Sequence, residues 1–318
     1  MDLLYNSVFL NHDTGMHPES RKRLQLFDHL PDTPLRDGRE YLELVHSQPY
    51  IRMVKQASYF GNPLDGDTLT SPGSFEAAYS AAALTVQASE SNDFALVRPP
   101  GHHAYPEHAS GFCLFNNIAI ATQKLVLEGK RVAIFDFDGH LGDGTEAIFY
   151  DTDHVLYWSM HQYPAFPGNG FVDEIGAGKG KGFTINVPLP PGSGDDIFMH
   201  SMDHFLPVLE QFQPDIVAVS AGFDAHQFDP LLQLKASGNA FYSIGWMLSE
   251  RFPYLFAVLE GGYNLDFLKK NVYNFQAGVN HEPLPFEEAP TMSGMRVWEV
   301  YETYVHSVIS KLSPYWKF

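Results

Sequence analysis

The sequence predicts an α/β fold built on one parallel β-sheet with helices on both of its faces. Five short segments are apolar at nearly every position, as strands are when both faces of their sheet are buried. Segments with helical spacing alternate with them, and this order favours a parallel sheet. Ionisable residues follow each apolar segment. The strands are expected at residues 94–97, 132–137, 155–160, 216–220 and 255–259.

Helices are expected where apolar residues recur with a helical period around these strands. The third of them should end before Pro214, because proline cannot continue a helix. A further helix should close the chain. The first three helices are expected at residues 74–89, 116–128 and 195–212, and the last contains Val297, Tyr301, Tyr304, Val308 and Leu312.

The 318 residues contain no obvious linker, repeat or low-complexity stretch, and their length allows one large α/β domain or two smaller ones. Hydrophobic residues make up 44% of the chain, which supplies a core and argues against disorder. Cys113 is the one cysteine, which excludes an intrachain disulfide and a Cys-rich zinc knuckle. No apolar run reaches the roughly 18 residues of a membrane span. No signal peptide is recognisable either, so a cytoplasmic protein is expected.

The chain is strongly acidic, with 38 acidic and 20 basic residues and a formal charge of −18. Such a surface repels nucleic acid phosphates and anionic membranes, so neither is expected as a partner. It favours cationic partners, such as lysine-rich peptides or polyamines. Solubility or adaptation to salt accounts for the charge equally well. The composition leaves the oligomeric state open.

Ionisable residues follow all five predicted strands. The carboxyl ends of parallel strands meet at one edge of a sheet, where α/β proteins bind their ligands. Chance would not usually bring five such groups to one edge, so we predict the active site there. In chain order these groups are His102 with His103, Asp136 with Asp138 and His140, Ser159 with His161, Asp224, and Glu260 with Tyr263.

Carboxylates and an imidazole after the second strand predict a divalent metal site. Asp136, Asp138 and His140 occupy every second position, so on an extended chain their side chains point to one side. Burying them is costly unless they bind a cation or one another. Asp138, His140 and Asp224 give three ligands and leave a position open, as in catalytic zinc sites, although iron, cobalt or manganese also accept such ligands. For Asp138 and His140 alone, a capped turn is the alternative.

A histidine pair and a tyrosine are candidates for the acid–base chemistry. His102 and His103 lie in a rigid loop, where an imidazole can take a proton from water and pass it to a leaving amine. Such histidines need a carboxylate on the far nitrogen, and Asp136 and Asp143 are available. Tyr263 follows two glycines, and its hydroxyl can donate to an oxyanion. Taken alone, these motifs also fit a surface His-His pair and a packing tyrosine.

Together these motifs resemble those of the histone deacetylase family, including its bacterial deacetylase-like amidohydrolases. They follow the family's order over roughly residues 5–265. The resemblance implies a single catalytic domain over residues 1–318, of the arginase–deacetylase type, with an eight-stranded parallel sheet. The matching runs are HDTGMHPESR, LTSPGS, RPPGHHA, SGFCLFNN, DFDGHLGDGT, SMHQYPAFPGNG, NVPLPPG, SAGFDAHQFDP and LEGGY.

The resemblance also implies a role for each motif residue. His103 resembles the family's principal general base, and His102 its electrostatic or acid partner. Asp143 would hold His103, and Asp136 would hold His102. Tyr263 stands in the place of the oxyanion tyrosine. The implied zinc ligands are Asp138, His140 and Asp224.

Two monovalent cation sites and a substrate tunnel are implied as well. Phe112 and Phe166 would form the tunnel walls for an acyl-lysine, beside Gly111. The rim aspartate that holds the substrate backbone corresponds to Asp67, with Asp65 as the alternative. A potassium ion beneath the zinc would touch Asp136, Asp138, His140, Ser159 and Met160. The second site would use backbone oxygens near Phe149, Thr152, Val155 and Phe183.

Two positions depart from the family pattern. Leu141 stands where many members have a second histidine that is not a zinc ligand, so altered activity is an open alternative. Leu231 follows Asp229-Pro230, where one polyamine-deacetylating branch has an acidic gatekeeper, and it therefore favours acylated lysine in peptides or proteins. The predicted function is zinc-dependent hydrolysis of N-ε-acyl-lysine. Acetylpolyamine hydrolysis and a non-catalytic acyl-lysine-binding protein are the alternatives.

Overall fold

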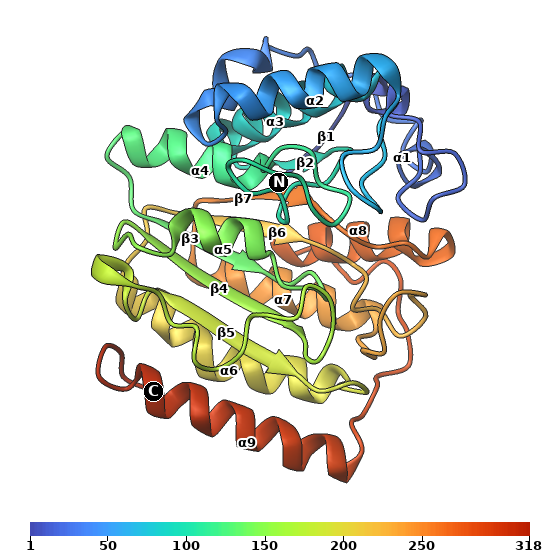
Figure 1. Cartoon of the computed structure of the whole chain (residues 1–318). Helices are drawn as coiled ribbons and strands as arrows, with labels where there is room; N and C mark the ends of the chain where they lie inside the picture. The colour runs from blue at the N-terminus through green and yellow to red at the C-terminus, as the bar shows by residue number, and fades with distance from the viewer.

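One parallel sheet organises the computed structural model, which describes residues 1–318. Its seven strands lie in the order β1-β2-β7-β6-β3-β4-β5, and every neighbouring pair is parallel (Figure 1). The carboxyl ends of all seven therefore point to the same edge. The strands are β1 Leu3–Tyr5, β2 Phe94–Leu96, β3 Val132–Asp136, β4 Val155–Gln162, β5 Thr184–Leu189, β6 Ile216–Ala221 and β7 Leu255–Leu259.

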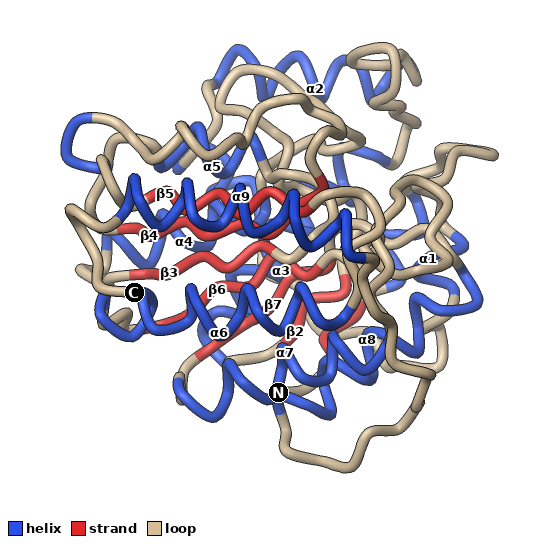
Figure 2. Tube along the Cα trace, turned by 90° about the horizontal axis from the view of Figure 1, so that it is seen from below, coloured by secondary structure: helices blue, strands red, loops and turns tan.

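Helices cover both faces of this sheet (Figure 2). On one face α3 packs on β2 and β7, and α4 packs on β3 and β6. On the other, α6 contacts β4, α7 lies against α6 and α8, and α9 lies along β5. The helices are α1 Lys22–Gln25, α2 Gln48–Phe60, α3 Ser74–Ser91, α4 Asn117–Leu127, α5 Asp143–Phe149, α6 Asp195–Phe212, α7 Gly238–Arg251, α8 Leu265–Val279 and α9 Met295–Leu312, with short 3₁₀ helices at Ser7–Asn11, Gly38–Leu44 and Gly178–Gly180.

The five predicted strands and the four predicted helices are confirmed, with ends that differ by a few residues. Two strands were not predicted. β1 has only three residues, which is too short to show a period. β5 contains Pro188, and a proline within an apolar run argues against a strand. β5 tolerates it because it lies at the edge of the sheet, where one side of the backbone needs no partner.

The expected eighth strand is absent, and that detail of the prediction was wrong. At the β1 edge the next segment makes a single parallel bridge, between Tyr5 and Asp32. The Thr33 amide still donates to the Tyr5 carbonyl at 2.7 Å. Pro31 and Pro34 flank this bridge and have no N–H to extend it into a ladder. No helix is both long and apolar enough to span a bilayer.

Candidate active site

The backbone bends immediately after β3, and this bend creates the candidate metal site. β3 ends at Asp136, so the extended chain that we expected through His140 was wrong. Phe137 anchors the bend, because its ring packs 5.6 Å from Phe223 and 5.8 Å from Phe241, measured between centroids. The bend nevertheless brings the Asp138 and His140 side chains together.

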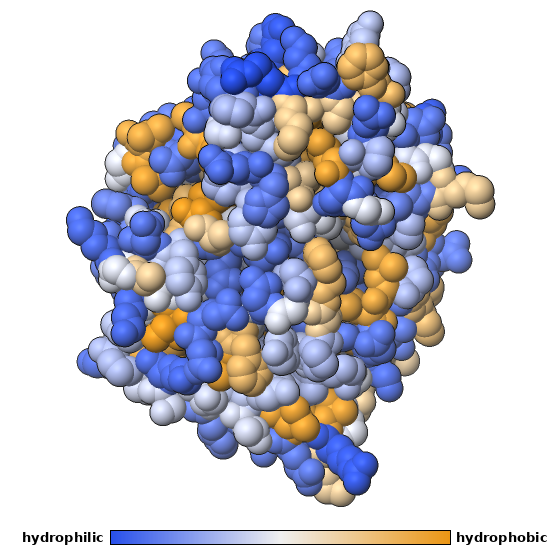
Figure 3. All heavy atoms as spheres, viewed as in Figure 1, coloured by the Kyte–Doolittle hydropathy of each residue, from blue (hydrophilic) through white to orange (hydrophobic).

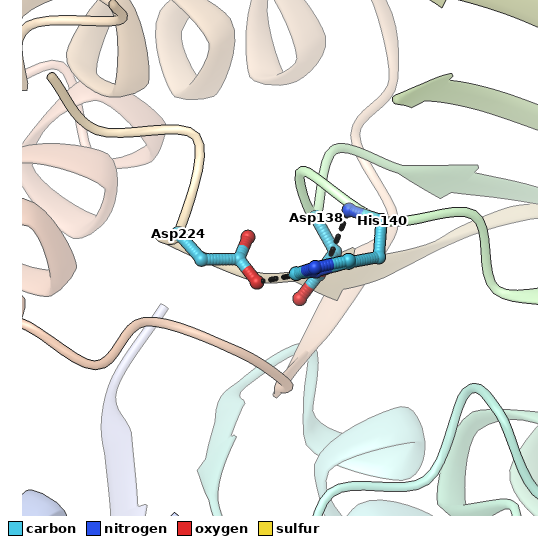
Figure 4. A group of neighbouring side chains, drawn as sticks. All are labelled: Asp138, His140 and Asp224. Carbon is cyan, nitrogen blue, oxygen red and sulfur yellow. Dashed lines mark hydrogen bonds and ion pairs between the residues drawn. The ribbon is translucent and has the colours of Figure 1, made fainter. Parts of the chain in front are cut away.

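Asp138, His140 and Asp224 converge as the sequence predicted. One ligand atom from each lies within 4.8 Å of the other two. Asp138 and His140 come from the loop after β3, and Asp224 comes from the loop after β6 (Figure 4). The His140 Nδ1 atom lies 2.9 Å from Asp224 Oδ2 and 3.3 Å from Asp138 Oδ1. Two carboxylates and an imidazole are a ligand set that suits zinc and related divalent ions.

Backbone amides hold both carboxylates in place. The Gly261 N–H donates to Asp138 Oδ2 at 2.8 Å, and the Gly139 N–H donates to Asp224 Oδ1 at 2.7 Å. A β-carbon at Gly261 would approach Asp224 Oδ2 to 2.4 Å, so only glycine fits there. The cradle therefore has the donor chemistry, the close backbone approach and the second-layer hydrogen bonds that a bound divalent ion requires.

Each histidine of the pair contacts its own carboxylate. The His102 Nδ1 atom lies 3.1 Å from Asp136 Oδ2, and the His103 Nδ1 atom lies 2.6 Å from Asp143 Oδ1. These are the two pairings that the family resemblance implied. The Tyr105 hydroxyl also donates to Asp143 Oδ2, at 3.0 Å. With Nδ1 of His103 occupied by the carboxylate, its Nε2 atom is free to act on a reactant.

The two imidazoles have opposite tendencies to ionise. Burial and the neighbouring charge of His102 lower the pKa of His103 to about 4. Burial opposes the charge on His102 as well, but the carboxylates of Asp138 and Asp136 outweigh burial and raise the pKa of His102 well above its usual range. A neutral His103 is a proton acceptor at neutral pH, and a charged His102 is an electrostatic partner.

Tyr263 is presented to the site by a loop that other residues fix. Its backbone N–H donates to the Asp229 carboxylate at 2.7 Å. The Arg23 guanidinium lies 5.0 Å from the centre of the Tyr263 ring. Burial, reinforced by Asp224 and Asp138 against the opposing charge of Arg23, raises the pKa of Tyr263 well above its usual range. Its hydroxyl is therefore a hydrogen-bond donor at neutral pH.

His103, His140 and Tyr263 open into one pocket of about 390 Å³. Phe166 packs edge-on against His103, with 5.1 Å between ring centroids, and Phe112 packs against Tyr263 at 5.7 Å. All five residues predicted to contact substrate lie in its wall. The lining residues are Asp65, Gly66, Asp67, His103, Ser110, Gly111, Phe112, His140, Phe166, Leu231 and Tyr263.

The two aspartates at the rim differ in their contacts. Asp65 closes its own turn, because its carboxylate accepts hydrogen bonds from the amides of Asp67 and Thr68 and from the Thr68 hydroxyl. Asp67 lies 3.2 Å from Nε2 of His17, a ring that packs 4.5 Å from Phe112. Asp67 is the more available of the two for a substrate.

The expected monovalent cations stay predictions. Asp136 and Ser159 are opposite each other in the β3–β4 register, at the end of the strand that leads to Asp138, and Met160 follows. At the second expected site the Thr152 amide donates to the Phe149 carbonyl at 3.4 Å, and the Tyr157 amide donates to the Phe183 carbonyl at 2.9 Å. Val155 begins β4 near them.

Two residues support the site from behind: Glu260, which the sequence placed at this edge without a role, and Arg23, which sequence reasoning missed. The buried Glu260 carboxylate accepts hydrogen bonds from the backbone amides of Gly101 and His102, at 2.7 and 3.1 Å, and so holds the histidine loop. Arg23 donates to the Gly262 carbonyl at 2.8 Å and to the Glu260 carbonyl at 2.5 Å. Glu260 had a sequence signal, since it lies in the LEGGY motif, whereas Arg23 lies outside all the matching runs and had none.

Leu141 occupies a fully buried position in the core. One of its methyl groups lies 2.7 Å from the point where a β-carbon of Gly170 would be. The Gly170 carbonyl in turn lies 2.8 Å from Nε2 of the buried His161. Leucine therefore fills this space by packing, and the ligand cluster beside it is intact.

The fold and the site define a class of α/β protein, of the arginase–deacetylase type, with its ligand cluster at the carboxyl edge of a parallel sheet. Residues 17–279 match the family described as the histone deacetylase domain. A probable deacetylase of Archaeoglobus fulgidus is 37% identical over 292 residues, which cover 83% of this chain and 81% of that protein. The chain therefore belongs to the histone deacetylase family.

Two further comparisons agree. A histone deacetylase-like amidohydrolase of Pseudomonas aeruginosa is 38% identical over 273 residues, covering 78% of this chain and 72% of that protein. The crystal structure of the HDA15 HD domain superposes with a TM-score of 0.88 at 29% identity, and 98% of each chain is covered. Family membership places this protein among deacetylases and amidohydrolases.

Proposed function

We propose that this protein is a zinc-dependent deacylase that hydrolyses the amide bond of N-ε-acyl-lysine in peptides or proteins. The observation that carries the proposal is that His140 of the ligand cluster, His103 and Tyr263 meet in one pocket with aromatic walls. A pocket with the aromatic walls Phe112 and Phe166 that contains His103, His140 and Tyr263 suits a long aliphatic side chain capped by an amide. Acetylated lysine has that shape.

Asp138, His140 and Asp224 would hold the zinc ion. When bound, zinc supplies Lewis-acid polarisation of the acyl carbonyl and acidifies a coordinated water. His103 accepts the proton of the attacking water, since its low pKa leaves the ring neutral at pH 7 and Asp143 orients it. The Tyr263 phenol donates a hydrogen bond to the oxyanion as it forms. A histidine of the pair then protonates the departing lysine amine.

An acetylpolyamine is the second candidate substrate. Asp65 and Asp67 both line the pocket, and their carboxylates suit a second ammonium group. Leu231, at the position of the acidic gatekeeper, opposes this reading because an apolar side chain there gives a cationic ligand no partner. We therefore place acyl-lysine first.

Turnover of an acetyl-lysine peptide and of N-acetylputrescine by the zinc-loaded protein tests the choice. We expect a higher kcat/KM for the peptide, and Leu231→Glu should shift the preference toward N-acetylputrescine. A wild-type preference for the polyamine would reverse the assignment.

In Tyr263→Phe we expect kcat to fall by about 10²- to 10³-fold with little change in KM, because only the transition state uses the hydrogen bond from the Tyr263 hydroxyl. Full activity in this variant would refute the oxyanion role.

A further inference from the structure

Two histidines lie one helical turn apart on α6, away from the pocket described above. His200 and His204 are partly exposed, and their ring centroids are 4.2 Å apart. Neither residue lines the pocket. Side chains at positions i and i+4 of a helix lie on the same face, so the two imidazoles lie side by side on one face of α6. α9 lies beside them, and Tyr301 of α9 contacts His200 (Figure 1).

The hydrogen bonds of His204 fix which of its nitrogens carries the proton. The Nδ1 atom lies 2.9 Å from the backbone carbonyl of His200. A carbonyl oxygen can only accept, so Nδ1 is the donor and carries the hydrogen. In the neutral ring the lone pair is then on Nε2, which no protein group uses.

A chain of three contacts gives His200 the same arrangement. The Ser201 hydroxyl lies 2.9 Å from the Ile197 carbonyl, the Tyr301 hydroxyl lies 2.7 Å from the Ser201 oxygen, and His200 Nδ1 lies 3.0 Å from the Tyr301 oxygen. All three bonds form together in one way only. Ser201 donates to the carbonyl, Tyr301 donates to Ser201, and His200 Nδ1 donates to Tyr301. The lone pair of His200 is therefore on Nε2 as well.

We propose that His200 and His204 form a second metal site, which chelates a divalent transition ion such as Zn²⁺, Ni²⁺ or Cu²⁺ through their two Nε2 atoms. Imidazole nitrogen suits these ions, and hard ions such as Mg²⁺ and Ca²⁺ prefer oxygen. The contacts to Tyr301 and to the helix backbone hold both rings by Nδ1, as hydrogen bonds to the far nitrogen do in known metal sites.

Neighbouring residues make the position suitable for a cation. Burial and the neighbouring His204 lower the pKa of His200, which favours the neutral ring that a metal requires, while the Asp203 and Glu302 carboxylates act in the opposite direction and would favour a bound cation. His306 of α9 also lies close enough to influence His200 electrostatically, and it is exposed. The three imidazoles do not form a group of ligand atoms within 4.8 Å of one another, so His306 would become a third ligand only by moving its side chain toward the pair. A third ligand from α9 would link that helix to α6.

Fluorescence provides a direct test, because the Trp298 ring lies 5.3 Å from the His200 ring and bound Cu²⁺ quenches a nearby indole. The protein is first loaded with one equivalent of zinc, and Cu²⁺ or Ni²⁺ is then titrated while calorimetry counts the ions bound. We expect one further saturable equivalent, with quenching by Cu²⁺. In His204→Gln the affinity should fall by roughly 10²-fold, since the chelate loses one of two linked ligands.

His154→Gln is the control, because it removes an exposed histidine elsewhere on the chain and should leave the second equivalent unchanged. His306→Gln shows whether α9 contributes: a partial loss of affinity identifies a third ligand, and unchanged affinity identifies a two-histidine site. The proposal is overturned if the zinc-loaded protein takes up no further equivalent. It is also overturned if His204→Gln binds as tightly as the wild type. Deacylase activity is not a readout here, so the outcome is independent of the proposed function.

Discussion

His140 lies between two buried carboxylates, and its charge state links metal binding to pH. Burial disfavours the charged ring, but Asp224 and Asp138 outweigh burial and raise the pKa of His140 to about 10 in the metal-free protein. The ring is therefore protonated at neutral pH. It can ligate a metal only after it loses that proton.

We predict that zinc binding to the metal-free protein at pH 7 releases about one proton from this residue. Titration calorimetry in two buffers with different ionisation enthalpies measures the number released. A metal-free buffer blank corrects for reactions of zinc with the buffer itself. Zinc uptake with no release of protons would contradict the ligand role of His140.

Glu146 is a buried carboxylate with only one of its oxygens satisfied. The Asn186 amide donates to Oε1 at 3.0 Å, and Oε2 has no partner. Burial and the nearby Glu174 carboxylate raise the pKa of Glu146 from 4.5 to about 8. The unfolded chain loses this proton near pH 4.5, while the folded protein keeps it up to about pH 8. The free energy of unfolding should therefore fall as the pH rises from 4.5 to about 8.

In Glu146→Gln the loss of unfolding free energy that this residue causes at rising pH should disappear, because glutamine has the shape of the protonated acid and does not titrate. The wild type should lose up to about 1.4 kcal/mol per pH unit from this group. Urea unfolding of both proteins at pH 5.5 and pH 8, in the same zinc-containing buffer, gives the two slopes. Parallel slopes would mean that Glu146 ionises normally in the folded protein.

At the scale of elements, Glu19 joins segments that are remote in the sequence. Arg98, just after β2, donates to the Glu19 carboxylate at 2.5 and 2.8 Å, and Arg23 of α1 lies 3.3 Å from it. All three side chains are buried. Burial opposes ionisation of Glu19, but the Arg98 charge outweighs it and holds the pKa of Glu19 well below its usual range. The cluster supports the loop that carries Tyr263, through Arg23.

Replacement of Glu19 by glutamine should leave two buried guanidinium groups without a counter-charge. We expect a loss of about 3–5 kcal/mol in the free energy of unfolding. Asp37→Asn is the matched control, because it breaks an exposed ion pair with Arg39 and should cost less than about 1 kcal/mol. Urea unfolding measures both. Similar small losses in the two variants would show that the buried cluster contributes little.

The sequence predicted those elements whose signal is local. Apolar strands, helical periods and the ionisable residues after each strand are visible in short windows, and the parallel topology then brings those residues to one edge. Contacts across long separations are not visible in this way. Glu19 and Arg98 are 79 positions apart, and Arg23 and the Gly262 carbonyl are 239 apart. The spacing of Asp136, Asp138 and His140 suggested an extended chain, but the backbone bends after Asp136 because Phe137 is anchored in the core.

At the scale of the whole molecule, the charge of −18 bears on substrate choice. Hydrophilic side chains predominate on the face in Figure 3, with apolar groups scattered among them. Asp65 and Asp67 add negative charge at the pocket itself. A cationic substrate is attracted by this field before it touches the site, and dissolved salt screens the attraction over about 10 Å at 0.1 M.

If the protein is the deacylase that we propose, KM for a lysine-rich acetyl-lysine peptide should rise, by roughly tenfold, between 20 and 500 mM salt. The reason is that screening slows the encounter of unlike charges while the chemistry in the buried site, which salt barely reaches, is unaffected, so kcat should stay constant. A peptide with glutamates around the same acetyl-lysine should show the opposite trend, because its repulsion is screened. Steady-state kinetics on both peptides measures the difference. Equal salt dependence for the two would mean that the acidic surface serves solubility and does not select the substrate.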